Sequence, residues 1–252
     1  MPDILAAAGS TSGLIWLVVA VCVAGLVRGF AGFGSAMIIM PVAASVLSPV
    51  QAVTFTVFTE LLGPLPNLPD AWRTAHLRDI LLLLLGAAVA LPFGLWALAV
   101  VDPMLFGWMV SVIVLTLLAL LMTGWRYRGR LNARLTAAAG ALGGFMTGVA
   151  GLPGPPVIML YMASVQPIAV IRANFLLYLL ALDLMLIPLM WGTGLLVWEV
   201  ALLGLLIGVP NLVANFLGAR LFDPGAERLF RAVAYLVIAL SAMLGLPIWN
   251  GD

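Results

Sequence analysis

The chain has 252 residues, of which 64% are hydrophobic and 8% are charged, and its formal net charge is +1. A soluble domain carries about 25% charged residues, because water must solvate its surface. This composition therefore excludes a soluble protein and indicates a membrane protein. A single cysteine, Cys22, and a single histidine, His76, exclude a disulfide framework, a Cys or His metal site and a Ser-His-Asp triad. We expect neither an enzyme nor a metal or other cofactor.

Apolar runs follow one another along the whole chain, over residues 13–28, 35–47, 50–68, 78–100, 103–123, 135–150, 154–165, 168–190, 194–217 and 229–248. A membrane-spanning helix needs about 20 apolar residues, and most of these runs are long enough. Two neighbouring pairs, the first and second runs and the sixth and seventh, are shorter, and a glycine-rich tip joins the members of each pair. Each pair is predicted either to cross as two short helices or to re-enter as a hairpin that stops near the bilayer centre.

The arginines indicate the orientation in the membrane. They gather in the connections 69–79, 124–134 and 218–231, whereas the connections 101–103 and 191–194 have none. Cytoplasmic loops carry an excess of basic residues. The three arginine-rich connections are therefore predicted to be cytoplasmic, and both termini periplasmic. No basic face is left outside these loops, so binding of nucleic acid is excluded.

The sequence contains an internal repeat. GFAGFGSAMIIM (29–40) matches GVAGLPGPPVIM (148–159), and a proline, Pro49 or Pro167, opens the next helix in each copy. The offset stays near 120 residues, so the chain is predicted to consist of two repeats, 1–130 and 131–252, within one membrane domain.

The two repeats are predicted to be inverted in the membrane. Each contains an odd number of crossings, whether the short pairs cross or re-enter, so the second repeat must be inserted upside down. The loop charges agree, because the connection at Asp102 has no arginine while the equivalent connection at Asp223 is arginine-rich. Inverted repeats with broken helices are a transporter design. The predicted fold is an all-α polytopic membrane protein in which each repeat has one short helix pair and three transmembrane helices.

The glycine-rich tips are the predicted substrate site. Ser35 and Gly154 lie where short helices begin, and free amides at a helix N-terminus attract anions. Arg28 adjoins the first tip, and Arg172 lies in the helix after the second. The predicted substrate-binding residues are Arg28, Gly32, Phe33, Gly34, Ser35, Gly151, Pro153, Gly154, Arg172 and Asn174. The alternatives are that the glycines only permit tight helix packing and that the arginines are membrane-edge charges.

Two carboxylates, Glu60 and Asp183, lie well inside predicted helices. Ionisable groups in a membrane are costly and usually functional. We expect them to carry coupling protons or to pair with Arg28 or Arg172; a fixed structural ion pair is the alternative. Other polar side chains in the helices are Gln51, Thr54 and Thr56, which offer neutral donors. Asn211 and Asn215 lie four residues apart on one helix face, and they are expected to hold helices together, with hydrogen bonding to the substrate as the alternative.

The motifs RGFAGFGSAMIIMPV and GGFMTGVAGLPGPPVIMLYM, with the RANF segment of Arg172 in the second copy, resemble the TauE/SafE sulfite exporter family, also called the toluene sulfonate uptake permease family. The resemblance covers nearly the whole chain, although the first copy has Phe33 and Ser35 where the family has a denser glycine run. It implies a multi-pass carrier of the bacterial inner membrane that moves sulfite or an organosulfonate such as sulfoacetate.

The leading hypothesis is a secondary transporter that exports a small sulfur oxyanion by alternating access with proton coupling. The alternatives are a passive anion channel, a carrier of a small carboxylate, and an enzyme or assembly subunit within the membrane. The expected partners are a small anionic substrate and the lipid bilayer, and a homodimer is compatible with the sequence.

Overall fold

The computed structural model describes residues 11–31, 34–123, 132–152, 157, 160, 167–221 and 226–249. Every regular element in this part of the chain is a helix. The chain divides into two compact units. The first unit consists of Met1–Gly63, Val101–Thr123 and Val197–Asp252, and the second of Pro64–Val100 and Gly124–Leu196.

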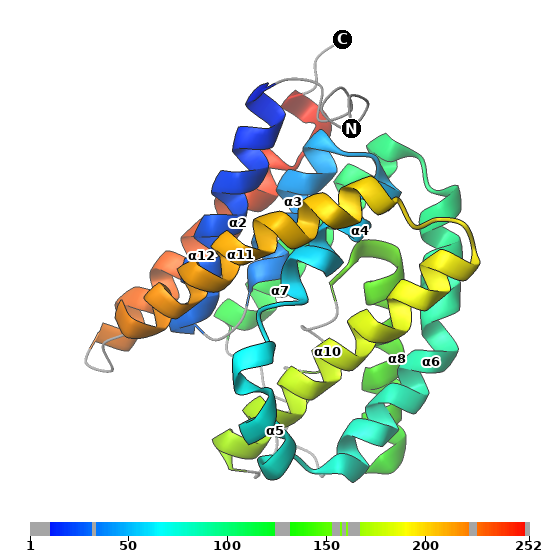
Figure 1. Cartoon of the computed structure of the whole chain (residues 1–252), viewed down its shortest axis with the longest axis vertical. Helices are drawn as coiled ribbons and strands as arrows, with labels where there is room; N and C mark the ends of the chain where they lie inside the picture. The colour runs from blue at the N-terminus through cyan, green and yellow to red at the C-terminus, as the bar shows by residue number, and fades with distance from the viewer. Residues whose placement is uncertain are drawn as a thin grey trace. The chain divides into compact units, whose positions relative to one another are not determined.

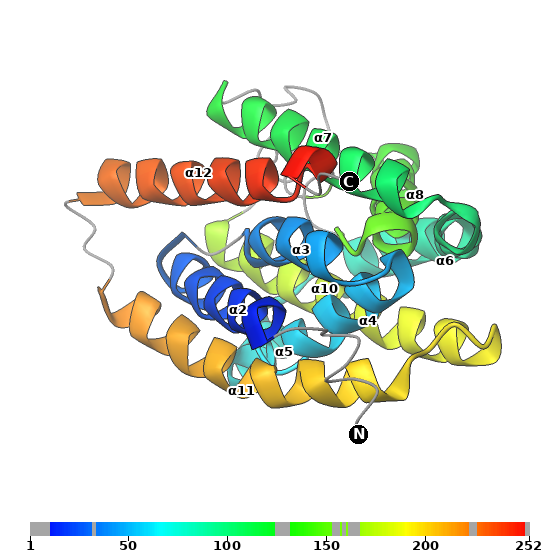
Figure 2. The ribbon, with the colours of Figure 1, turned by 90° about the horizontal axis from the view of Figure 1, so that it is seen from above.

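The first unit is built around a short buried helix. Its helices are α2 (Thr11–Ala31), α3 (Ser35–Val46), α4 (Pro49–Glu60), α7 (Pro103–Met122), α11 (Trp198–Leu221) and α12 (Glu227–Leu244), with a 3-10 turn at Pro247–Trp249. Helix α3 packs against α2, α4, α7 and α12, and its residues Ile38, Ile39 and Met40 are almost fully buried. Helix α11 packs along α2 and also against α4, and the views in Figures 1 and 2 both place α2 and α11 side by side.

Helices α3 and α4 are both too short to cross a membrane. Each has 12 residues, which is about 18 Å of helix against a hydrocarbon core of about 30 Å. They are separated because Ser48 is extended and Pro49 starts α4, where the Ser48 amide donates to Gln51 Oε1 (3.1 Å). Helix α2, with 21 residues, is long enough to span. The short neighbours in this half are therefore α3 and α4, and not the runs 13–28 and 35–47.

The sequence prediction of one long helix over residues 50–68 is wrong. Helix α4 ends at Glu60, and a turn, the 3-10 helix η1 (Leu65–Asn67) and the short helix α5 (Leu68–Thr74) follow it. The apolar side chains continue past the end of the helix, but Gly63 and Pro64 interrupt the helical backbone. Glu60 consequently lies at a helix end and not in the middle of a span.

The second unit contains η1, α5, α6 (Leu77–Val100), α8 (Ala133–Ala150) and α10 (Ile168–Gly192). Helix α6 packs along α8, as Figure 2 shows, and also against α10. Glycines make this contact close, because a Cβ on Gly140, Gly144 or Gly148 of α8 would overlap with the α6 backbone. Small residues four apart are typical of helix packing in membranes.

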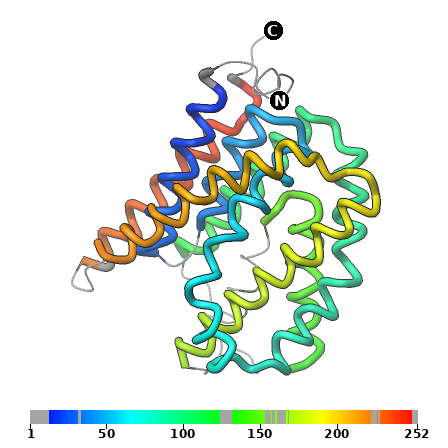
Figure 3. Tube along the Cα trace, in the orientation of Figure 1, coloured from blue at the N-terminus to red at the C-terminus, as the bar shows by residue number. Residues whose placement is uncertain are grey.

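Each unit combines helices from both halves of the sequence. Helices α2 and α4 of the first half pack on α11 of the second, whereas α8 and α10 of the second half pack on α6 of the first. The chain changes unit after Gly63, Val100, Thr123 and Leu196. Figure 3 traces the course of the chain by residue number. The predicted repeat boundary near residue 130 lies outside the described residues.

Five described helices are long and apolar enough to cross a membrane: α2, α6, α7, α10 and α11. Large apolar side chains on them are exposed, as are Leu85, Phe93 and Trp96 on α6. Such a surface is stable against lipid and not against water. The chain is a multi-pass membrane protein.

Candidate anion site

The first unit contains a polar cluster in which three helices contribute one side chain each. Arg28 lies in the last turn of α2, Ser35 is the first residue of α3 and Glu60 is the last residue of α4. Arg28 Nη1 donates to Glu60 Oε2 at 2.7 Å, and Ser35 Oγ donates to the same oxygen at 2.9 Å. Nη1 also lies 3.4 Å from Ser35 Oγ. We call these three residues the Arg28 cluster.

Two glycines lie beside the cluster, one directly before Ser35 and one shortly after Glu60. Gly34 has a φ of 94°, a left-handed conformation that costs glycine little, and it sets Ser35 at the start of α3. Gly63 follows α4, and a Cβ there would lie 3.3 Å from Arg28 Nη1. A side chain at position 63 would crowd Arg28, and a residue other than glycine at position 34 would strain the backbone that leads into Ser35.

The cluster is largely removed from solvent. The side chains of Arg28 and Glu60 are 14% and 13% exposed. A charge held at such burial is stable only with a partner of opposite sign, and each of these two residues supplies that partner for the other. The structure thus pairs Glu60 with Arg28, which was one of the alternatives that the sequence left open.

Part of this cluster has hydrogen-bonding capacity that the described residues do not use. A guanidinium has five N–H donors, and both hydrogen bonds that Arg28 makes with described residues use Nη1. The Nε and Nη2 edge of the guanidinium has no partner among them. On the acid, Glu60 Oε1 is buried and likewise lacks a partner in the described part of the chain.

Thr59 is a polar neighbour of the cluster that the sequence did not single out. Its hydroxyl is buried without a partner among the described residues, whereas Thr54 and Thr56 donate to carbonyls of their own helix. Helix α4 carries one glutamine and three threonines, and no feature of the sequence distinguishes Thr59 from the other two threonines. Gln51, another predicted donor, acts at the start of the helix as an acceptor, since its Oε1 accepts from the Ser48 amide.

The predicted site residues of the second unit are spread along two helices. Gly151 ends α8 with a φ of 59°. On α10, Arg172 is exposed, whereas Asn174 and Asp183 are buried. Asn174 Oδ1 accepts a hydrogen bond of 2.7 Å from the backbone N–H of His76, and thereby ties α10 to the joint between α5 and α6. Gly32, Phe33, Pro153 and Gly154 lie outside the described residues.

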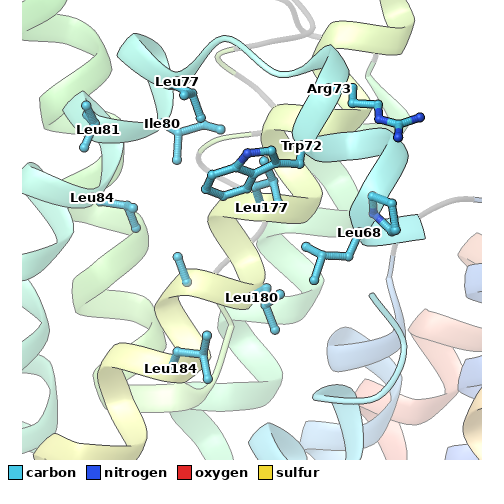
Figure 4. A pocket seen from close by; sticks show the side chains of 12 residues that line it. Leu68, Trp72, Arg73, Leu77, Ile80, Leu81, Leu84, Leu177, Leu180 and Leu184 are labelled. Atoms are coloured by element: carbon cyan, nitrogen blue, oxygen red, sulfur yellow. The ribbon is translucent and has the colours of Figure 1, made fainter. Parts of the chain in front are cut away.

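The second unit also has an apolar cavity of about 720 Å³ between α5, α6 and α10. Figure 4 shows leucines along most of its wall, among them Leu84, Leu177 and Leu184, with Trp72 and Arg73 on α5. A lining with so few polar groups cannot replace the hydration shell of a small oxyanion. Among the described residues, the Arg28 cluster has the better chemistry for an anion.

Comparison with protein families identifies the family of the chain. The model of the sulfite exporter TauE/SafE family matches residues 17–244. The chain belongs to this family. The match includes all three residues of the Arg28 cluster and extends from α2 into the last turn of α12. Neither the curated proteins nor the solved structures give a match to the chain.

Proposed function

We propose that this TauE/SafE protein is a secondary transporter that exports a small sulfur oxyanion, sulfite or an organosulfonate such as sulfoacetate, by alternating access. The observation that carries the proposal is the Nε and Nη2 edge of the largely buried Arg28 guanidinium, which has no partner among the residues that the structure describes. A guanidinium edge presents two parallel N–H donors to two oxygens of one anion. Sulfite and sulfonates both offer such a pair of oxygens.

The packing of the helices supports alternating access. The exchange in which α11 packs on α2 and α4, while α6 packs on α8 and α10, is the pattern expected of two equivalent halves that lend helices to each other. An inverted repeat of this kind gives two related arrangements of one site, open to either side of the membrane.

We further propose that the transport is coupled to protons, with Glu60 and Asp183 as the candidate carriers. Both are buried or nearly so and lie on helices of a membrane protein, where an acid that can lose its charge is tolerated better than a permanent one. Arg172, Asn174 and Gly151, which lie in the second unit, stay candidate substrate-binding residues in this proposal. The orientation in the bacterial inner membrane, with both termini periplasmic, follows from the loop arginines.

Flux into proteoliposomes tests the function. The Arg28→Gln variant is expected to reduce sulfite flux at least tenfold, since it removes the charge and the free donor edge. Arg73→Gln, a change of the same kind at an exposed position of α5, is the matched control and should leave flux unchanged. Wild-type flux in the Arg28→Gln variant contradicts the site.

The same vesicles separate a carrier from a channel. A proton-coupled carrier accumulates sulfite against its gradient when a pH gradient is imposed, whereas a passive anion channel only dissipates gradients. Competition by a small carboxylate that is stronger than competition by any sulfonate would assign the site to carboxylates. Accumulation that ignores the pH gradient contradicts proton coupling.

A further inference from the structure

We propose that Arg28 and Glu60 form one coupled unit in which Arg28 takes the anion on its Nε and Nη2 edge while Glu60 takes one proton on Oε1. The inference rests on the proposed function, because it assumes that Arg28 binds the transported anion. It adds the stoichiometry, one proton for each anion, and the atom that receives the proton.

The charge of the cluster leads to this coupling. The guanidinium and the carboxylate are 2.7 Å apart and mostly buried, so together they are neutral. An anion that joins Arg28 would leave a net negative charge in a poorly solvated place, which is costly. A proton on Glu60 removes this excess. The bound state then holds the Arg28 cation, the anion and a neutral acid, and its net charge is again zero for a monovalent anion.

The hydrogen bonds indicate which oxygen is protonated. Oε2 accepts from both Arg28 Nη1 and Ser35 Oγ, whereas Oε1 is buried and accepts from no described residue. A proton on Oε1 breaks neither existing hydrogen bond, because Oε2 remains an acceptor as the carbonyl oxygen of the acid. A proton on Oε2 would displace at least one of the two donors. The proton comes from water on the side to which the site is open and returns to water with the anion.

No other charged group that the structure describes is placed to do this work. Helix α4 has no second charged residue, and the helices α3 and α11 pack against it. Helix α3 has no titratable side chain, and α11 is charged only at Glu199 and Arg220. Helix α11 passes the end of α4 at Gly208, opposite the Thr59 carbonyl, and Glu199 lies more than two helical turns from there. Arg220 lies next to Ala219, where α11 packs on Gly29 of α2, but its side chain is exposed and stacks on Phe216. A guanidinium stays protonated, so Arg220 cannot take the proton.

On α2, Cys22 is the other titratable group, and it lies six residues before Arg28. Helix α12 also packs against α2 and α3, and its described charged side chains, Arg228 and Arg231, are exposed guanidiniums that are already protonated. Tyr235, the remaining titratable side chain described on α12, is not an acid that loses its proton near neutral pH.

The second half of the sequence lacks an equivalent ion pair. Arg28 precedes Gly29 as Thr147 precedes Gly148, and Glu60 follows Pro49 at the same spacing as Tyr178 follows Pro167. Both counterparts are neutral and bond within the second unit, Thr147 to the Gly143 carbonyl and Tyr178 to the Gly140 carbonyl. The proton count is therefore assigned to the Arg28 cluster alone, and Asp183 is not needed for it.

Calorimetry on the purified full-length protein tests the coupling. Methanesulfonate is the probe, because its own charge does not change with pH as that of sulfite does. Binding is measured in buffers of different ionisation enthalpy, which gives the number of protons taken up. For the wild type we expect proton uptake that reaches a maximum near one proton per anion. In the pH range where uptake is near one, the affinity for methanesulfonate is expected to fall about tenfold for each unit by which the pH rises. Uptake of no proton at any pH overturns the inference.

Two variants locate the proton. Glu60→Gln keeps the shape and neutral form of the acid, and it is expected to bind methanesulfonate with no proton uptake and no pH dependence. Glu199→Gln, an exposed acid in the first turn of α11, is the matched control and should behave as the wild type. Proton uptake that persists in Glu60→Gln assigns the proton elsewhere and overturns the proposal.

The outcomes distinguish this inference from the function on which it rests. If methanesulfonate, sulfoacetate and sulfite bind neither the wild type nor Glu60→Gln, the proposed function fails. If they bind through Arg28 without proton uptake, the function stands and the coupling fails. Size-exclusion chromatography checks that Glu60→Gln is folded, and the wild-type proton count decides the question even if that variant is not.

Discussion

Ser35 Oγ lies 2.9 Å from Glu60 Oε2, the same oxygen that accepts from Arg28. Two donors from two different helices thus converge on one carboxylate oxygen at the end of α4. Since α2, α3 and α4 each supply one member, the cluster fixes the ends of three helices relative to one another. Its members therefore affect stability as well as anion binding, and the two effects need separate measurements.

The Arg28–Glu60 pair is expected to show strong coupling in stability. Removing one member of a buried ion pair costs about 3–5 kcal/mol, because the other charge is left unpaired. Arg28→Gln should therefore destabilise the protein strongly, and adding Glu60→Gln to it should recover much of the loss. Denaturant titration of the single and double variants in detergent measures this. Additive losses would show that the two charges act independently.

The hydrogen bond between Asn174 and His76 is expected to stabilise the second unit. Asn174→Ala leaves the His76 amide without its acceptor, and a lost buried partner costs about 1–3 kcal/mol. Arg172→Gln, two residues away on an exposed position of the same helix, is the control and should leave the unfolding midpoint unchanged. Equal midpoints for both variants would contradict a structural role for Asn174.

The contact between α6 and α8 is expected to tolerate no added atom at Gly144. A Cβ there would lie 2.6 Å from the Cα of Ala87, which is backbone and cannot rotate away. Gly144→Ala should cost about 1–3 kcal/mol by overpacking, and Gly144→Leu should abolish folding. Gly192→Ala is the control, since nothing lies within 4 Å of a Cβ at that position. Thermal unfolding followed by size-exclusion chromatography gives the readout.

The proposed orientation makes opposite predictions for two exposed positions of the second unit. In a Cys22→Ser background, which has no cysteine left, His76→Cys is expected to react with an impermeant thiol reagent from the cytoplasmic side only. Thr193→Cys, in the connection without arginine, is expected to react from the periplasmic side only. Labelling of both from one side would contradict the assignment from loop charge.

The sequence predicted the long helices well and the breaks between them poorly. Helix α7 begins at Pro103 as expected, because the Asp102 side chain accepts from the amides of Met104 and Leu105 and caps the helix. The end of α4 was missed, since hydropathy continues through Leu61 and Leu62 although the helix stops at Glu60. Hydropathy predicts which segments lie in the membrane, but it does not predict where a helix ends within such a segment.

The sequence named the residues of the candidate site but did not predict most of the contacts between them. Arg28 and Glu60 were singled out because charged groups within a membrane are costly, and Ser35 because a short helix begins there. In the sequence, Glu60 lies 32 positions after Arg28 and 25 positions after Ser35. No local sequence pattern predicts a contact between residues on different helices at such separations. Asn174 shows the same limit, because its partner His76 is 98 residues away.

The exchange of helices between the two halves constrains how the protein is made. Helix α6 is synthesised before α8, and α2 before α11, so each leaves the ribosome without the helix that covers its glycines. Gly25 and Gly29 of α2 contact α11 near residues 211 and 215, in the second half of the chain. The first half must therefore remain in the bilayer with its closest packing surfaces uncovered until the second half is inserted. Insertion and final packing are separate stages for this chain, and a stop codon after the first half would yield inserted helices that lack their partners.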